Sequence, residues 1–141
     1  MKDSRTGVFG ILSLFVVLGA KWAGLCSLQG GERRLYLFFI PGFSRSAMVI
    51  AMAFMEYVGG EKGIARELLC GNKDKKTALG AAFIPVAALL LFSFRTGIRF
   101  ILITLVIGLL WTWHCKRKIG GMTGDTLGAL CEIAEALLFI G

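Results

Sequence analysis

A stretch near the C-terminus holds the residues with the clearest chemical potential. Residues 120–135 begin with glycines, and Asp125, Glu132 and Glu135 follow inside an otherwise apolar segment. In a helix these three acids and Gly128 would share one face. A carboxylate in a bilayer interior costs about 2.5–3.5 kcal/mol, so a cation or a proton is needed to offset the glutamates.

The residues just before the acids suggest an anion site. Four of them could present backbone N–H groups to a phosphate: Gly120, Gly121, Thr123 and Gly124. Glycine-rich turns that enter a helix are suited to this role. Two alternatives stay open, because Asp125 could be a helix cap and the two glutamates could be polar contacts between helices.

The composition indicates an integral membrane protein. Apolar residues make up 56% of the 141-residue chain, against about 45–50% in soluble domains. The net charge of +7 is typical of basic loops between membrane helices. Basic residues do not alternate with aromatic ones, so we expect no nucleic-acid partner.

Long apolar runs predict an all-α, polytopic helix bundle with about five transmembrane helices in a single domain, residues 1–141. The runs cover 7–28, 35–58, 77–94, 101–113 and 125–140. Short polar segments at 29–34 and 95–99 are predicted to connect them. On the last helix, the face opposite the acids is predicted to carry Leu127, Leu130, Ala134 and Leu137.

Three residues within the runs are ambiguous. Lys21 could snorkel to the membrane interface, which is the favoured interpretation, or it could be a buried partner for an acid. Pro41 could break the second helix and create a cavity, or it could begin the true helix. Arg45 would line that cavity in the first case and lie in the first turn in the second.

The distribution of basic residues predicts the membrane topology. If five helices cross the membrane, ten lysines and arginines fall on one side and four on the other. The larger set is Lys2, Arg5, Lys62, Arg66, Lys73, Lys75, Lys76, Lys116, Arg117 and Lys118, and the smaller is Arg33, Arg34, Arg95 and Arg99. The positive-inside rule makes the first side cytoplasmic. We therefore expect a multi-pass protein of a prokaryotic cell membrane with its polar site facing the cytoplasm.

Three blocks of the sequence resemble the cobalamin synthase family, the adenosylcobinamide-GDP ribazoletransferases. The longest is Gly-Gly-Met-Thr-Gly-Asp-Thr-Leu-Gly-Ala-Leu-Cys-Glu-Ile-Ala-Glu at 120–135. The second is Met-Lys-Asp-Ser-Arg-Thr-Gly at 1–7, and the third is Ser44-Arg45 before an apolar helix. The blocks occur in the order that the family has.

The resemblance implies a membrane transferase of the last step of cobalamin biosynthesis. Such an enzyme joins α-ribazole, or its 5′-phosphate, to adenosylcobinamide-GDP, releases GMP and uses Mg²⁺. The expected catalytic residues and Mg²⁺ ligands are Asp3, Asp125, Glu132 and Glu135, because their hard oxygen atoms suit Mg²⁺. The expected substrate-binding residues are Ser4, Arg5, Arg45, Lys73, Gly120, Gly121, Thr123 and Gly124.

One departure from the family pattern is an acidic block, D-G-x-x-D-x-x-D-G, that this sequence does not match. The resemblance covers the C-terminal part of the family, so we expect a fragment that does not catalyse alone. Two alternatives from other classes are an ion- or proton-coupled transporter or channel subunit, and an enzyme like the CDP-alcohol phosphotransferases. The lower base and the oligomeric state stay open.

Overall fold

The computed structural model describes residues 7–55, 58 and 75–141, and the regular elements in these ranges are all helices. They are α1 (Val8–Ser27), α2 (Gly30–Phe54), α4 (Lys75–Phe92), α5 (Phe94–Lys118) and α6 (Gly124–Ile140). Three helices of this described part, α1, α2 and α5, are long and apolar enough to cross a membrane. The expected all-α membrane bundle is therefore confirmed.

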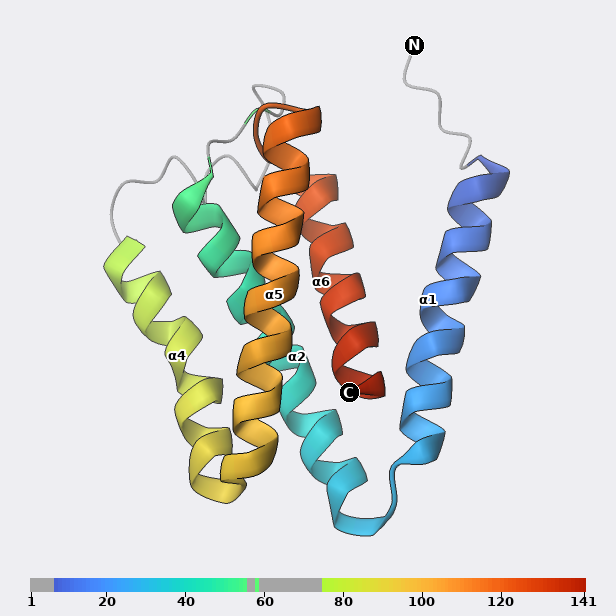
Figure 1. The fold of residues 1–141 in the computed structure, drawn as a ribbon, viewed down its shortest axis with the longest axis vertical. Helices are drawn as coiled ribbons and strands as arrows, with labels where there is room; N and C mark the ends of the chain where they lie inside the picture. Colours follow the sequence, from blue (N-terminus) through green and yellow to red (C-terminus); the bar gives the residue numbers. More distant parts are fainter. Residues whose placement is uncertain (1–6, 56–57, 59–74) are drawn as a thin grey trace.

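Helix α2 lies at the centre of the bundle. It packs against α4, α5 and α6, whereas α1 packs mainly on α6 (Figure 1). Helices α1 and α6 run in the same direction, and they separate toward their N-terminal ends. Most large apolar side chains of α1, such as Phe9 and Phe15, are exposed. In a membrane these side chains face lipid or other protein.

Two predicted connections are helical instead. Helix α2 begins at Gly30, so the predicted polar turn at 29–34 is mostly its first turn, where Glu32 favours a helix N-terminus. Helix α5 begins at Phe94, and Ser93 alone separates it from α4. The predicted connection at 95–99 was wrong, because long arginine side chains can remain helical while their charges reach the interface.

Both prolines lie inside continuous helices, Pro41 in α2 and Pro85 in α4. Neither interpretation of Pro41, as a helix break or as a helix start, was right. Pro41 has no N–H to donate to the carbonyl of Leu37, one turn earlier, so the helix loses one backbone hydrogen bond here. Helix α2 nevertheless continues through Pro41, and Arg45 Nη1 donates to the carbonyl of Pro41 at 2.9 Å.

Two apolar clusters form the core. In the first, Phe100 of α5 packs edge-to-face on Tyr36 and Phe43 of α2, with ring centroids 4.9 and 5.3 Å apart. The second surrounds the start of α6. Of the predicted apolar face of α6, the first three members are buried, but Leu137 is 42% exposed and Leu138 is buried instead. The helix is rotated slightly from the predicted orientation.

The described members of the two basic sets that end α5 and begin α2 and α5 lie at opposite ends of the bundle, whereas Lys2, Arg5, Lys62, Arg66 and Lys73 lie outside the described residues. Lys116, Arg117 and Lys118 form the last turn of α5, beside the start of α6. The four arginines of the smaller set lie in the first turns of α2 and α5, at the other end (Figure 1). Which end faces the cytoplasm stays a prediction.

Candidate functional site

A cluster of charged side chains joins α1 to α6. Lys21 Nζ donates to Glu132 Oε2 at 2.6 Å and to Glu135 Oε2 at 2.8 Å. The side chains of Lys21 and Glu135 are each 17% exposed, and that of Glu132 is 54% exposed. The favoured interpretation of Lys21 as a snorkelling residue was therefore wrong, and the alternative, a lysine inside the bundle that is the partner of an acid, is confirmed.

Helix α2 completes this cluster through Ser44 and Arg45. The Ser44 hydroxyl donates to Glu135 Oε1 at 2.9 Å and accepts from Cys131 Sγ at 3.4 Å. Arg45 Nη1 lies 3.9 Å from the same carboxylate oxygen of Glu135. Two cations from α1 and α2 thus face two carboxylates of α6, and the cluster is balanced in charge. This balance removes most of the cost of placing the glutamates in a membrane helix.

A glycine allows α1 and α6 to approach closely enough for these bonds. A Cβ atom on Gly24 would lie 2.5 Å from the carbonyl oxygen of Phe139. Gly24 is one turn after Lys21 on α1, and Phe139 is one turn after Glu135 on α6. The backbone contact therefore fixes the separation at which a lysine spans the two helices.

Asp125 lies apart from this cluster, in the first turn of α6. Its side chain is exposed, and none of the ion pairs between described residues involves it. Thr123 is the N-cap, with its hydroxyl accepting from the Thr126 backbone at 3.3 Å, and Thr126 returns the contact. The cap position that was open for Asp125 thus belongs to Thr123, and the carboxylate of Asp125 remains available.

The turn between α5 and α6 only partly resembles the predicted anion nest. Gly120 has a φ of +77°, a left-handed conformation that favours glycine at a helix C-terminus. Gly121 is buried, and the N–H of Thr123 donates to Thr126 Oγ1. Of the four predicted donors, Gly124 is exposed at the start of α6, where backbone N–H groups lack partners within the helix. The nest stays a prediction, and Gly124 is its best-placed member.

The predicted metal site can be tested in part against the described residues. Within residues 7–55, 58 and 75–141, no three His, Cys, Asp or Glu side chains gather as metal ligands. Glu132 and Glu135 already hold the ammonium of Lys21, which occupies the position of a cation. The oxygen donors suit Mg²⁺ in kind, and Asp125 is an exposed acid that forms none of the ion pairs between described residues. Asp3, Ser4, Arg5 and Lys73 lie outside the described residues.

Lys21, Ser44 and Cys131 were not among the site residues predicted from the sequence. Lys21 and the glutamates are more than 110 residues apart, so no local spacing connects them. One signal was present: a single lysine in the first apolar run and two unpaired acids in the last require one another. Ser44 could have been found from its position beside Arg45.

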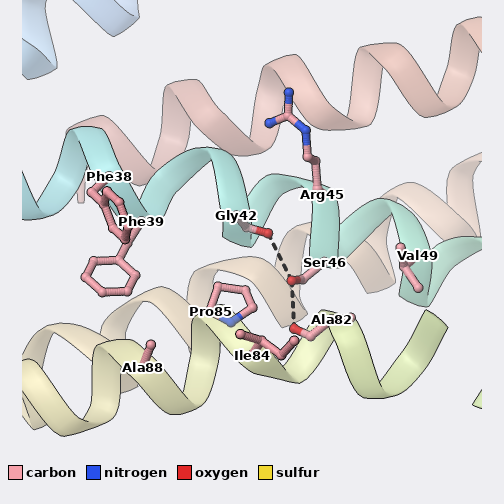
Figure 2. Close-up of a pocket in the computed structure, with 10 residues that line it drawn as sticks. All are labelled: Phe38, Phe39, Gly42, Arg45, Ser46, Val49, Ala82, Ile84, Pro85 and Ala88. Carbon is pink, nitrogen blue, oxygen red and sulfur yellow. Dashed lines mark hydrogen bonds between the residues drawn. The ribbon is translucent and has the colours of Figure 1, made fainter. Parts of the chain in front are cut away.

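A groove runs between α2 and α4 on one side of the cluster, with a volume of about 510 Å³. Phe38, Phe39 and Pro85 line its apolar part, while Ser46 donates to the carbonyl of Ala82 at 2.7 Å (Figure 2). Arg45 lies at the border of the groove and projects from α2 on the side away from α4. The arginine therefore connects the groove with the cluster of charges.

The family model and the curated relatives that match this chain all point to the same family. A sequence model described as cobalamin-5-phosphate synthase matches residues 1–141. An adenosylcobinamide-GDP ribazoletransferase of Synechococcus elongatus is 35% identical over 99% of this chain and 57% of its own length. Those of Syntrophobacter fumaroxidans and Alkaliphilus metalliredigens are each 36% identical, over 98% and 99% of this chain and 55% of their own lengths. No solved structure matches.

The chain thus spans a little over half the length of the curated relatives that it matches. The match to the family covers the whole sequence, including the acidic helix α6 and the turn before it. The predicted resemblance is confirmed, and the chain belongs to the cobalamin-5-phosphate synthase family.

Proposed function

We propose that the protein acts in adenosylcobinamide-GDP ribazoletransfer, joining α-ribazole or its 5′-phosphate to adenosylcobinamide-GDP with release of GMP. The observation that carries this proposal is the family match over residues 1–141, together with relatives named for the same activity. In such a transfer, a ribazole hydroxyl oxygen bonds to the phosphorus that stays with cobinamide, and the bond from that phosphorus to GMP breaks.

The start of α6 supports a role in holding the diphosphate. The exposed backbone of Gly124 and the positive end of the helix dipole favour an anion at this point. The carboxylate of Asp125 in the same turn would repel a diphosphate unless a cation lay between them. We therefore propose that Asp125 binds Mg²⁺, with Asp3 as a second ligand. Bound there, Mg²⁺ would neutralise charge on the phosphate oxygens.

The cluster of Lys21, Glu132 and Glu135 supports a different role for the two glutamates. Because they are paired with Lys21, we propose that they fix cations of the protein and do not bind metal directly. Arg45, 68% exposed, is the cation of the cluster that is available to a phosphate group. Its planar guanidinium suits phosphate oxygens better than a lysine would.

The membrane position supports substrates from the cytoplasm. The basic last turn of α5, the turn after it and Asp125 lie at one end of the bundle (Figure 1). We propose that this end faces the cytoplasm of a prokaryotic cell, since basic residues collect on that side. Anionic substrates would then reach Asp125 directly.

A direct assay tests the proposal. Membranes containing the longest natural form of the protein are supplied with adenosylcobinamide-GDP, α-ribazole and Mg²⁺, and GMP release is measured. We expect GMP release that depends on both substrates and falls strongly in Asp125→Asn. The control Glu32→Gln, in the first turn of α2, should release GMP like the wild type. No release from the longest natural form of the protein, or undiminished release from Asp125→Asn, would contradict the proposal.

A further inference from the structure

The carboxylate of Glu135 divides its two oxygen atoms between different helices. Oε2 accepts from Lys21 of α1 at 2.8 Å. Oε1 accepts from Ser44 of α2 at 2.9 Å, and Arg45 Nη1 of the same helix lies 3.9 Å away. Lys21 and Ser44 therefore hold the carboxylate close to the guanidinium without a short contact between the two groups.

Arg45 is consequently close to an acid and yet largely uncommitted. Its Nη1 donates to the carbonyl of Pro41 at 2.9 Å, and its side chain is 68% exposed. A guanidinium has five N–H donors, so several can still reach an anion. Glu135, only 17% exposed, would be a strong competitor for those donors if its charge were not already compensated.

We propose that Lys21 is a positioning residue that saturates Glu135 and so leaves Arg45 free to bind a phosphate group. Without Lys21, the partly buried carboxylate of Glu135 would draw the guanidinium from 3.9 Å into a close ion pair. The phosphate would then have to displace Glu135. The identity of the phosphate ligand rests on the proposed function, whereas the competition between Lys21 and Arg45 for Glu135 does not.

This competition predicts that a second substitution, Glu135→Gln, reverses the effect of Lys21→Met on Arg45. Lys21→Met should trap Arg45 on Glu135. Adding Glu135→Gln should release Arg45 again, because a neutral amide attracts a guanidinium much less than a carboxylate does. The remaining acid, Glu132, forms its ion pair with Lys21, and none of the ion pairs between described residues joins it to Arg45. If Lys21 served only to hold α1 against α6, the second substitution would bring no recovery.

Chemical modification of arginine tests the relation without requiring turnover. Phenylglyoxal labelling of Arg45 is followed by mass spectrometry of peptides, in native membranes, with the exposed Arg33 as internal reference. Relative to Arg33, we expect labelling of Arg45 to fall about fivefold in Lys21→Met, as for a partly exposed ion pair, and to recover in Lys21→Met/Glu135→Gln. Lys21→Arg is the matched control that keeps the charge, and its labelling should stay near that of the wild type.

Two further measurements separate this proposal from the proposed function. Ser44→Ala keeps Lys21 but frees Oε1, and it should lower Arg45 labelling by a smaller factor even if Lys21→Met folds poorly. In the assay of GMP release, the KM for adenosylcobinamide-GDP should rise in Lys21→Met and fall back in the double variant. Unchanged Arg45 labelling in Lys21→Met, or a double variant labelled no better than the single one, would overturn the role of Lys21. Absence of GMP release by the wild type would instead overturn the proposed function alone.

Discussion

Two helix contacts of this bundle each contain a glycine that allows the helices to approach closely. Charged side chains surround the glycine at one contact, and apolar side chains surround it at the other. At the contact of α1 with α6, a Cβ on Gly24 would lie 2.5 Å from the carbonyl oxygen of Phe139. At the contact of α2 with α4, a Cβ on Gly42 would lie 2.9 Å from Cβ of Pro85. In each case a glycine lets two helices approach closely, as small residues do in membrane proteins.

The two contacts differ in what surrounds the glycine. Beside Gly24, the ion pairs of Lys21 bridge the helices, and Gly24 is the one residue of α1 that is fully buried. Beside Gly42, a neutral hydrogen bond from Ser46 accompanies a core that includes Phe39 and Leu89. The comparison indicates that charge holds α1 in place, whereas packing holds α4. Removing a charge should therefore weaken the contact of α1 with α6 most, and the contact of α2 with α4 should be less sensitive to loss of its polar group.

The largest effect is expected from Lys21→Met. The variant removes the cation that bridges α1 to two carboxylates of α6, and Arg45 of α2 can compensate Glu135 without restoring that bridge, so the free energy of unfolding should fall by on the order of 3 kcal/mol. The measurement is reversible unfolding in mixed detergent micelles. Lys116→Met, at an exposed position, is the control and should change little. Equal losses in the two variants would show that charge does not hold α1.

A smaller loss, on the order of 2 kcal/mol, is expected for Gly24→Ala, since overpacking forces the helices apart. The nearest atom is a backbone carbonyl oxygen, which cannot move without its helix. The ion pairs of Lys21 should lengthen as well. Gly19→Ala on the same helix meets nothing within 4 Å and serves as the control. If both variants unfolded alike, the close backbone contact would be irrelevant to stability.

For Gly42→Ala we expect a loss of about 1 kcal/mol, at the lower end of the range for overpacking. The nearest atom belongs to the ring of Pro85, and the next lies 3.4 Å away. The adjoining groove gives that ring room to shift. The same unfolding measurement applies, with Gly80→Ala as the control on α4, where nothing lies within 4 Å. A loss larger than that of Gly24→Ala would reverse the comparison.

The smallest effect is expected from Ser46→Ala. The variant loses the hydrogen bond to Ala82, and such bonds between membrane helices contribute about 0.6 kcal/mol on average. The packing of α2 on α4 should persist. Cysteines introduced on α2 and on α4 should then form a disulfide as fast in the Ser46→Ala background as they do with Ser46 present. Separation of α4 from α2 would show that the hydroxyl, and not packing, holds this contact.

Most of the fold could be predicted because long apolar runs and charged ends are local signals. The helix positions and the acidic face of α6 follow from them. The helix boundaries at Gly30 and Phe94 could not be predicted, since an arginine can either end a membrane helix or snorkel from its first turn. Pro41 was misread because α2 packs against α4, α5 and α6, which the sequence does not show, and a packed helix can tolerate the loss of one backbone hydrogen bond.

The candidate site was predictable only in its acidic half. The positions of Glu132 and Glu135 on one helix face follow from helical periodicity. Their compensation by Lys21 depends on the packing of α1 on α6, which Gly24 permits through a contact that no spacing in the sequence records. Asp125 and Gly124 remain predicted binding residues, and their exposure at the start of α6 is consistent with that role.

The separation of Lys21 from its acidic partners has a consequence for how the protein is made. Lys21 precedes Glu132 and Glu135 by 111 and 114 residues, so the ribosome completes α1 long before α6. Helix α6 is not among the described helices that qualify as membrane spans by length and hydropathy. Its glutamates become acceptable in the bilayer once the ammonium of α1 is already there. We therefore expect insertion of α6 into the membrane to depend on α1, because α1 supplies the cation that compensates the glutamates of α6.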